Sequence, residues 1–400
     1  MKVIKYLILF FLPAVTANAQ NIMTSSPYSM FGLGEIVTGL YGSNSAMGGV
    51  STGMRDAWLI NTENPAGLTG LDTLRLFAET SAFLKSESYR SKSGSSHAFT
   101  GNVSAFSLAG RIIPRWYMAA GLTPYSSVGY YFQSTQPLEG SPDSYYTSIF
   151  EGYGGLSKVY LTNAFMLTKN LSVGVNVSYI FGNTKLTESQ SDISVENRMY
   201  THNFYADFGL QYHRQLNRDA SFTVGAVYGY KQRLKLENSI AITYSSNETE
   251  QSKKNTTQYL PQYFGVGGSL AYKKWTYALD YSLHQYSCLS SGDSRVKFKD
   301  SHELKMGISY FPDGYTSGSY WKRITYKAGV DLSTPYMQIN GQTGYSYRVS
   351  AGMGLPVMNG RINAAFYYDR TQLKNNVFGR EAFGVTVSYT LSELFYKLKL

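Results

Sequence analysis

Alternation of apolar residues with small or polar residues dominates the chain from Thr73 onward. In residues 171–181, Leu, Val, Tyr and Phe occupy the odd positions, and Ser, Gly or Asn occupies most even positions. Residues 222–230, 347–355 and 383–389 repeat this scheme. A period of two places successive side chains on opposite faces of a strand. Such segments of about ten residues are typical of outer-membrane β-barrels, whereas a soluble sandwich would expose more Lys and Glu.

The alternation predicts an all-β fold, a transmembrane antiparallel β-barrel of 14 strands, and an even number allows such a barrel to close. The connections alternate between short turns, expected in the periplasm, and longer polar loops, expected outside. The strand at 219–247 is longer than a membrane span needs and should project beyond it. The predicted strands are 73–85, 98–111, 115–132, 153–168, 170–187, 198–216, 219–247, 254–272, 273–286, 295–311, 321–334, 344–355, 359–371 and 377–391.

Residues 44–68 interrupt the alternation and are rich in Gly, Ser and Ala. Their apolar members recur near helical spacing, which predicts a short helix, although its glycines make that helix weak by itself. We therefore expect residues 20–72 to form an N-terminal plug, or hatch, containing short helices inside the barrel. The candidate plug residues are Phe31, Met47, Met54 and Trp58.

The first 19 residues read as a signal peptide. Lys2 and Lys5 precede a short apolar run, and residues 17–19 (Ala-Asn-Ala) fit a cleavage site after Ala19. No later segment offers 18 consecutive apolar residues, so a barrel is the membrane structure that remains. The predicted domains are the signal peptide (1–19), the plug (20–72) and the barrel (73–400), located in the outer membrane of a Gram-negative cell.

Charge and titratable residues exclude several functions. The formal net charge is +10, but Lys and Arg are scattered, so we expect no nucleic-acid partner. The single cysteine, Cys288, cannot build a disulfide or a thiolate metal site, and the five histidines show no metal-ligand spacing. No motif marks a catalytic residue. We therefore expect no enzyme activity, no metal and no cofactor.

Four acidic residues fall inside predicted strands, where an unpaired charge would be costly. Arg348, Arg55 and Arg75 are the candidate partners. We expect a paired network in the lumen that holds the plug rather than a catalytic pair of carboxylates. The four acids are Asp207, Asp280, Asp331 and Asp369.

Several short motifs resemble the FadL-type outer-membrane transporters of long-chain fatty acids and other hydrophobic compounds, in the branch found in the Bacteroidetes. They are SPYSMFGLGE (26–35), SAMGGVSTGM (45–54), ENPAGL (63–68), LPQYFGVGGSL (260–270) and YRVSAGMGLP (347–356). The resemblance implies a 14-stranded barrel with an N-terminal hatch and a kink-made opening in its wall. Asn64, Pro65 and Ala66 match the family triad at the junction of hatch and first strand.

The predicted barrel and the family resemblance lead to two alternative functions. The first is uptake of hydrophobic small molecules, similar to long-chain fatty acids, by plug displacement and lateral exit. The second is that of a non-transporting outer-membrane barrel, a partner subunit in protein secretion or surface attachment. The expected partners are a hydrophobic small molecule, outer-membrane lipid and, in the second case, an envelope protein.

Overall fold

The computed structural model describes residues 23–37, 42–91, 94–138, 141–244, 247–312 and 318–394. The predicted signal peptide and the first residues of the predicted plug lie outside these ranges. Within them, no helix has both the length and the apolar character needed to cross a membrane.

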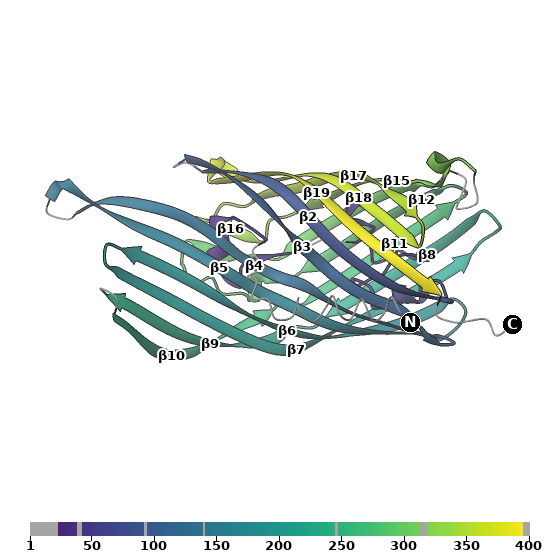
Figure 1. Ribbon diagram of the computed structural model, residues 1–400, viewed down its shortest axis with the longest axis horizontal. Helices are drawn as coiled ribbons and strands as arrows, with labels where there is room; N and C mark the ends of the chain where they lie inside the picture. Colours follow the sequence, from purple (N-terminus) through teal and green to yellow (C-terminus); the bar gives the residue numbers. More distant parts are fainter. Residues whose placement is uncertain are drawn as a thin grey trace.

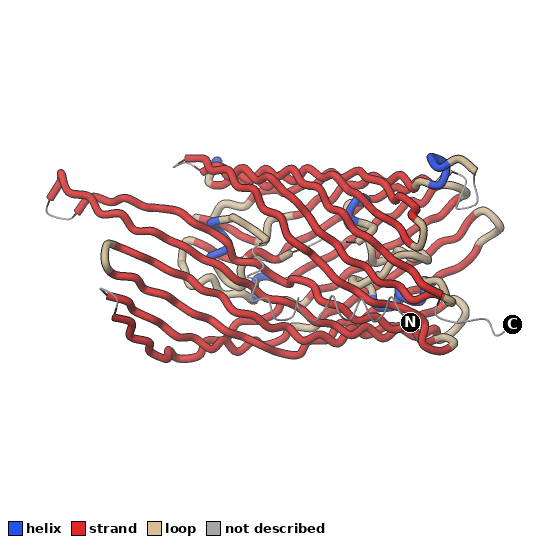
Figure 2. Tube along the Cα trace, in the orientation of Figure 1, coloured by secondary structure: helices blue, strands red, loops and turns tan. Residues whose placement is uncertain are grey.

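The wall is a closed antiparallel barrel of 14 strands (Figures 1 and 2), as the alternation predicted. Two of the predicted strands are each broken in two. β8 continues as β9 after Tyr230 and Lys231, and β10 continues as β11 after Pro261 and Gln262. Pro261 has no N–H to donate to a ladder, which explains the second break. β19 pairs with β2 along its whole length and closes the ring.

The wall segments in chain order are β2 (Arg75–Ser91), β3 (Gly94–Ile113), β4 (Trp116–Leu138), β5 (Ser141–Met166), β6 (Leu171–Gln190), β7 (Ile193–Gln215), β8 (Ala220–Gly229), β9 (Gln232–Tyr244), β10 (Asn247–Leu260), β11 (Tyr263–Tyr272), β12 (Trp275–His284), β14 (Ser301–Tyr310), β15 (Thr325–Ser333), β17 (Gly344–Val357), β18 (Gly360–Leu373) and β19 (Phe378–Leu394). The smaller elements are η1 (Pro27–Met30), β1 (Glu35–Ile36), η2 (Ser45–Met47), η3 (Pro65–Gly70), η4 (Tyr286–Cys288), β13 (Val296–Phe298), η5 (Tyr320–Arg323), β16 (Met337–Ile339) and η6 (Lys374–Asn376).

The two faces of the wall follow the sequence pattern. On β6, Ser172 and Asn176 face inward and are buried, whereas Val177 faces outward and is 43% exposed. An apolar outer face suits contact with lipid, and a small, polar inner face leaves room for chain inside the barrel.

The barrel is higher on one side than on the other. β5 has 26 residues and β7 has 23, whereas β12 and β14 have 10 each. The long strands labelled β5, β9 and β10 extend to the left in Figure 1 beyond the rest of the wall. We call the extended part of β5–β7, β9 and β10 the projecting wall. It lies at the end with the long loops, and the opposite end carries the short turns.

The predicted helix in residues 44–58 is wrong. The structure has only the 3-10 turn η2 there, and Gly48 and Gly49 follow it with φ values of +68° and +77°. Left-handed backbone at two successive residues ends a right-handed helix. The short helices expected in this region are present only as the 3-10 turns η1, η2 and η3.

The wall is open between β3 and β4 in its long-loop half. These strands pair only from Phe106 with Leu122 down to Ile113 with Trp116. Above that level β3 pairs with β2 and β4 pairs with β5, while the edge of β4 receives the two-residue strand β1 at Ser126 and Ser127. We call this gap in the ladder the wall opening.

Candidate functional site: the barrel interior and the wall opening

Residues 43–71, which we call the internal segment, lie inside the barrel against glycines of the wall. A Cβ added at Gly209 would come within 2.1 Å of the Asn64 side chain, and one at Gly329 within 2.1 Å of the Met47 backbone. A Cβ at Gly174 or Gly225 would lie 2.5 or 2.0 Å from the backbone of the same segment. These wall positions therefore need glycine because the internal segment contacts the strand directly.

Asp280 of β12 holds the middle of the internal segment. Its carboxylate accepts the backbone N–H groups of Ser51 at 2.6 Å, Thr52 at 2.8 Å and Gly53 at 3.4 Å. The Asp280 residue is 4% exposed, so these are buried hydrogen bonds to a charged acceptor. Such bonds contribute about 1.5–3 kcal/mol each, which makes Asp280 the main polar attachment of this stretch.

Asn64 joins the internal segment to itself and to the wall. Its Nδ2 donates to the Thr52 carbonyl at 2.7 Å and to the Leu210 carbonyl of β7 at 3.2 Å. Its Oδ1 accepts from Ala66 N at 3.1 Å and caps η3, which begins at Pro65. Asn64 and Ala66 are fully buried. The triad identified in the sequence is thus the point where the internal segment turns against the wall.

The four candidate plug residues do not form one cluster. Met47 and Met54 pack together with Val50 and Leu59 inside the barrel. Trp58 packs edge-on against Phe77 toward the short-turn end. Phe31 lies apart from them, in the N-terminal residues, and packs with the apolar clusters of the long-loop half.

Residues 23–37, which we call the N-terminal segment, occupy the wall opening. Met23 N donates to Ser127 Oγ of β4 at 2.9 Å, and Ser126 Oγ donates to the Leu33 carbonyl at 2.6 Å. On the other side of the opening, Ser25 Oγ lies 3.1 Å from Thr100 Oγ1 of β3. The segment therefore contacts both edges that the ladder leaves unpaired.

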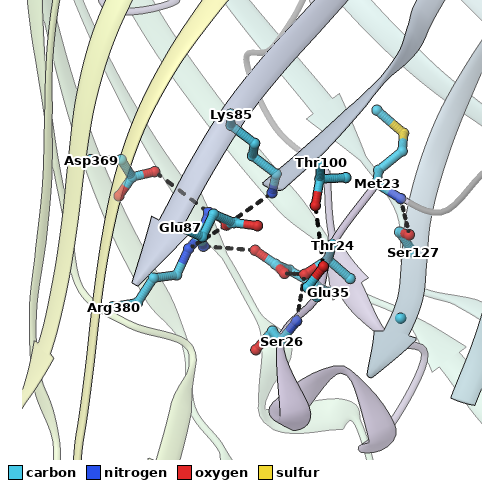
Figure 3. A network of polar contacts seen from close by, with 12 residues as sticks. Met23, Thr24, Ser26, Glu35, Lys85, Glu87, Thr100, Ser127, Asp369 and Arg380 are labelled. Atoms are coloured by element: carbon cyan, nitrogen blue, oxygen red, sulfur yellow. Dashed lines mark hydrogen bonds and ion pairs between the residues drawn. The ribbon is translucent and has the colours of Figure 1, made fainter. Parts of the chain in front are cut away.

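A network of charged residues anchors this N-terminal segment (Figure 3). Arg380 of β19 donates to Glu35 at 2.7 Å and to Glu87 of β2 at 2.9 Å, and Lys85 forms an ion pair with Glu87 at 3.0 Å. Lys85 and Glu87 are 3% and 1% exposed, so each charge relies on its partners. Thr24 also donates to Glu35.

The acidic residues predicted from the sequence have mixed outcomes. Asp369 pairs with Arg348 at 3.0 Å, as expected. Asp280 holds the internal segment, but through backbone N–H groups and not through Arg. Arg55 instead donates to Thr69 and Gln211, and Arg75 pairs with Asp72. Asp207 Oδ1 and Asp331 Oδ1 are buried and make no hydrogen bond with the described residues.

Four residues of this network were not predicted from the sequence: Glu35, Lys85, Glu87 and Arg380. Lys85 and Glu87 are two residues apart on a strand, so they share a face, and charges in an otherwise uncharged pattern were a usable signal. Their partners could not be named because Arg380 reaches them only when the barrel closes.

A cavity of about 190 Å³ lies beside this network. Its lining includes four acidic residues and four Lys, Arg or His residues, among them Glu303, Asp331, Arg348 and His284. The lining also includes apolar and aromatic side chains, among them Met23, Ile36 and Phe378, so the cavity has both charged and apolar walls. The neighbouring apolar part of the lumen is filled by the chain itself, with Leu33, Tyr286 and Phe298 packed together.

The closed 14-stranded antiparallel wall matches the fold of FadL-type outer-membrane barrels. Solved structures of that type match most of this chain. A sequence model of the BamG family matches residues 1–399, and the chain belongs to this family. A search of curated proteins found no match.

The similar solved structures are distant in sequence. The Ralstonia pickettii toluene transporter TbuX shares 15% identity, covering 87% of this chain and 97% of its own, with a TM-score of 0.59. The Pseudomonas putida toluene transporter TodX shares 15% identity over 92% of this chain and 100% of its own, with a TM-score of 0.57. A Pseudomonas aeruginosa FadL homologue shares 14% identity over 94% and 100%, with a TM-score of 0.56. At this identity the likeness establishes the fold.

Proposed function

We propose that this protein is an outer-membrane barrel that acts as a partner subunit for another envelope protein, in protein secretion or surface attachment. The observation that carries the proposal is that the barrel is filled. The internal segment is packed directly against wall glycines, the N-terminal segment occupies the wall opening, and the cavity that remains beside it is about 190 Å³. A barrel whose interior is filled by its own chain is a better scaffold than a path for apolar compounds.

The projecting wall supports this proposal with an uncovered apolar surface. On its inner face Val195 of β7 pairs with Ile242 of β9, and Ile193 pairs with Tyr244. Ile193, Ile242 and Tyr244 are 48%, 44% and 60% exposed. β12 and β14, which follow β11 in the ring, have only 10 residues each and do not extend to this level. An exposed apolar patch above the membrane band is typical of a surface that binds protein.

Affinity purification of the full-length protein from native outer membranes in mild detergent tests the proposal. We expect a stoichiometric protein partner with the wild type and its loss with the variant V195N/I242N. The variant S194N/T243N alters the neighbouring cross-strand pair on the opposite face and should keep the partner. Purification of the wild type alone, or equal retention by both variants, contradicts the proposal.

A second candidate is uptake of hydrophobic small molecules, similar to long-chain fatty acids, by displacement of the plug and lateral exit. The wall opening between β3 and β4 favours it because release of the N-terminal segment would expose a route from the lumen to the lipid. Transport of toluene by TbuX and TodX adds support. This candidate also includes three further predictions: that the chain is of the Bacteroidetes branch, that residues 1–19 are a signal peptide, and that residues 20–72 act as the hatch.

Mass spectrometry of lipid-like molecules extracted from the purified protein separates the two candidates. A discrete hydrophobic compound, together with impaired uptake by the variant N64A/P65A in a folded barrel, would support transport. Unchanged uptake by that variant would exclude the triad from a transport role.

A further inference from the structure

Three basic residues lie in a row on the outer face of β9 and the turn before it. Lys231, Arg233 and Lys235 are all exposed, whereas Leu234 and Leu236 between and beyond them are buried inside. The spacing of two along a strand places the three side chains on one face. Lys253 and Lys254 are also exposed, at the bulge of the adjacent strand β10.

The height of these residues corresponds to the upper boundary of a membrane. At about 3.4 Å per residue and a tilt of about 45°, Lys231 and Lys235 lie roughly 26 and 36 Å above the start of β8 at Ala220. The apolar band of such a barrel is about 25 Å tall. The long-loop end faces outward in this class of barrel, so the row lies at the level of the outer-leaflet headgroups.

Aromatic residues lie beside and directly below the row, as in an interfacial girdle. Tyr228 and Phe264 pack with ring centroids 5.0 Å apart on neighbouring strands, and Phe204 is 66% exposed. Lys231 Nζ lies 4.3 Å from the centre of the Tyr259 ring. Rings of this kind mark the depth at which acyl chains give way to headgroups.

The basic row lacks acidic partners, unlike the basic residues higher on the same face. Lys231, Arg233 and Lys235 form no ion pair with any other described residue, and Arg233 donates only to Thr257 Oγ1 at 3.2 Å. In contrast, Lys185 and Arg198 in the projecting wall pair with Glu196, and Arg198 also pairs with Glu248 and Glu250. Glu237 follows the row on the same face and separates the two regions.

We propose that Lys231, Arg233 and Lys235 form a binding site for the phosphate groups of a phosphorylated glycolipid of the outer leaflet. Arg and Lys donate charge-assisted hydrogen bonds to phosphate oxygens, and the aromatic residues below contact the acyl chains. The site lies on the outside of the wall and is independent of whether the barrel binds a protein partner or conducts a small molecule.

Native mass spectrometry of the full-length protein in detergent, titrated with bisphosphorylated lipid A, tests this site. We expect the wild type to bind and the variant K231Q/R233Q/K235Q to bind at least about tenfold more weakly, because each cation at a membrane surface contributes roughly fivefold. The matched variant K169Q/R218Q/K273Q removes the same charges from exposed positions at the short-turn end and should bind like the wild type.

Two further arms identify what the site recognises. Lipid A from which both phosphates have been removed should bind as weakly to the wild type as bisphosphorylated lipid A binds to the first variant. Inorganic phosphate at the same concentration should not compete. Equal weakening in both triple variants, strong binding of the dephosphorylated lipid, or competition by inorganic phosphate would each overturn the proposal.

Discussion

Arg380 and Glu35 are 345 residues apart in the chain, and their side chains meet at 2.7 Å inside the barrel. Arg380 belongs to the last strand of the wall, and Glu35 belongs to the segment that fills the opening between β3 and β4. This ion pair therefore links closure of the barrel to the position of the N-terminal segment.

Loss of the Glu35 charge should release the N-terminal segment. In the variant E35Q, Arg380 keeps Glu87 as a partner, so the barrel should stay folded. Removing one partner of a buried ion pair costs about 3–5 kcal/mol, and the partial exposure of this pair reduces that to roughly 1–3 kcal/mol. We expect hydrogen exchange in residues 23–37 to become at least about fivefold faster.

The variant E381Q is the control. Glu381 follows Arg380 in the chain, but its side chain lies on the other, partly exposed face of the strand and pairs with Arg370. Unchanged exchange of residues 23–37 in E35Q would show that the backbone contacts to β4 hold the segment without the ion pair.

The substitution D280N should loosen the middle of the internal segment. Asn offers one neutral oxygen in place of a carboxylate that accepts three backbone N–H groups. A loss of about 1.5–3 kcal/mol corresponds to roughly ten- to hundredfold faster hydrogen exchange at residues 51–53. The difference in gel mobility between unheated and heated samples, which reports a folded barrel, should stay the same. Loss of that difference would mean that Asp280 supports the wall itself.

The substitution G209A should displace the internal segment. The added methyl group would lie 2.1 Å from Asn64 Oδ1, far inside van der Waals contact. We expect increased protease cleavage within residues 43–71 and a lower unfolding temperature. The control G268A adds a methyl group whose nearest neighbour, the Thr223 carbonyl, is 3.6 Å away. Equal effects of the two variants would attribute the change to strand propensity rather than to this contact.

Acid should loosen the projecting wall at Glu196. Burial acts to raise the pKa of Glu196, but hydrogen bonds from Lys185 and Arg198 outweigh it and lower the pKa. A lowered pKa contributes stability that is complete above the ordinary value of about 4.3 and is lost as the pH falls through the folded value. The protection factors of residues 185–198 should therefore drop below about pH 4.

The variant E196Q supplies the comparison for that measurement. Its protection should be lower at neutral pH and should no longer depend on acid in this range. A wild type whose protection in residues 185–198 is constant down to pH 3 would contradict the role given to Glu196.

The sequence by itself determined the wall. Alternation with period two depends only on neighbouring residues, so the number of strands, their inward and outward faces and the buried Ser172 and Asn176 followed from local pattern. The end of the Gly-rich stretch at Asn64 was also visible, because Pro65 follows it and disfavours helical backbone at Asn64.

Only the tertiary structure decided what the wall contains. The spacing of Met47, Val50 and Met54 indicated a helix, but Gly48 and Gly49 adopt left-handed backbone because the segment must follow the wall glycines, which are distant in sequence. The partners of Asp280 and Arg380 likewise depend on closure of the ring. Contacts between residues hundreds of positions apart leave no periodic signal in a single sequence, and those contacts hold the interior of this barrel in place.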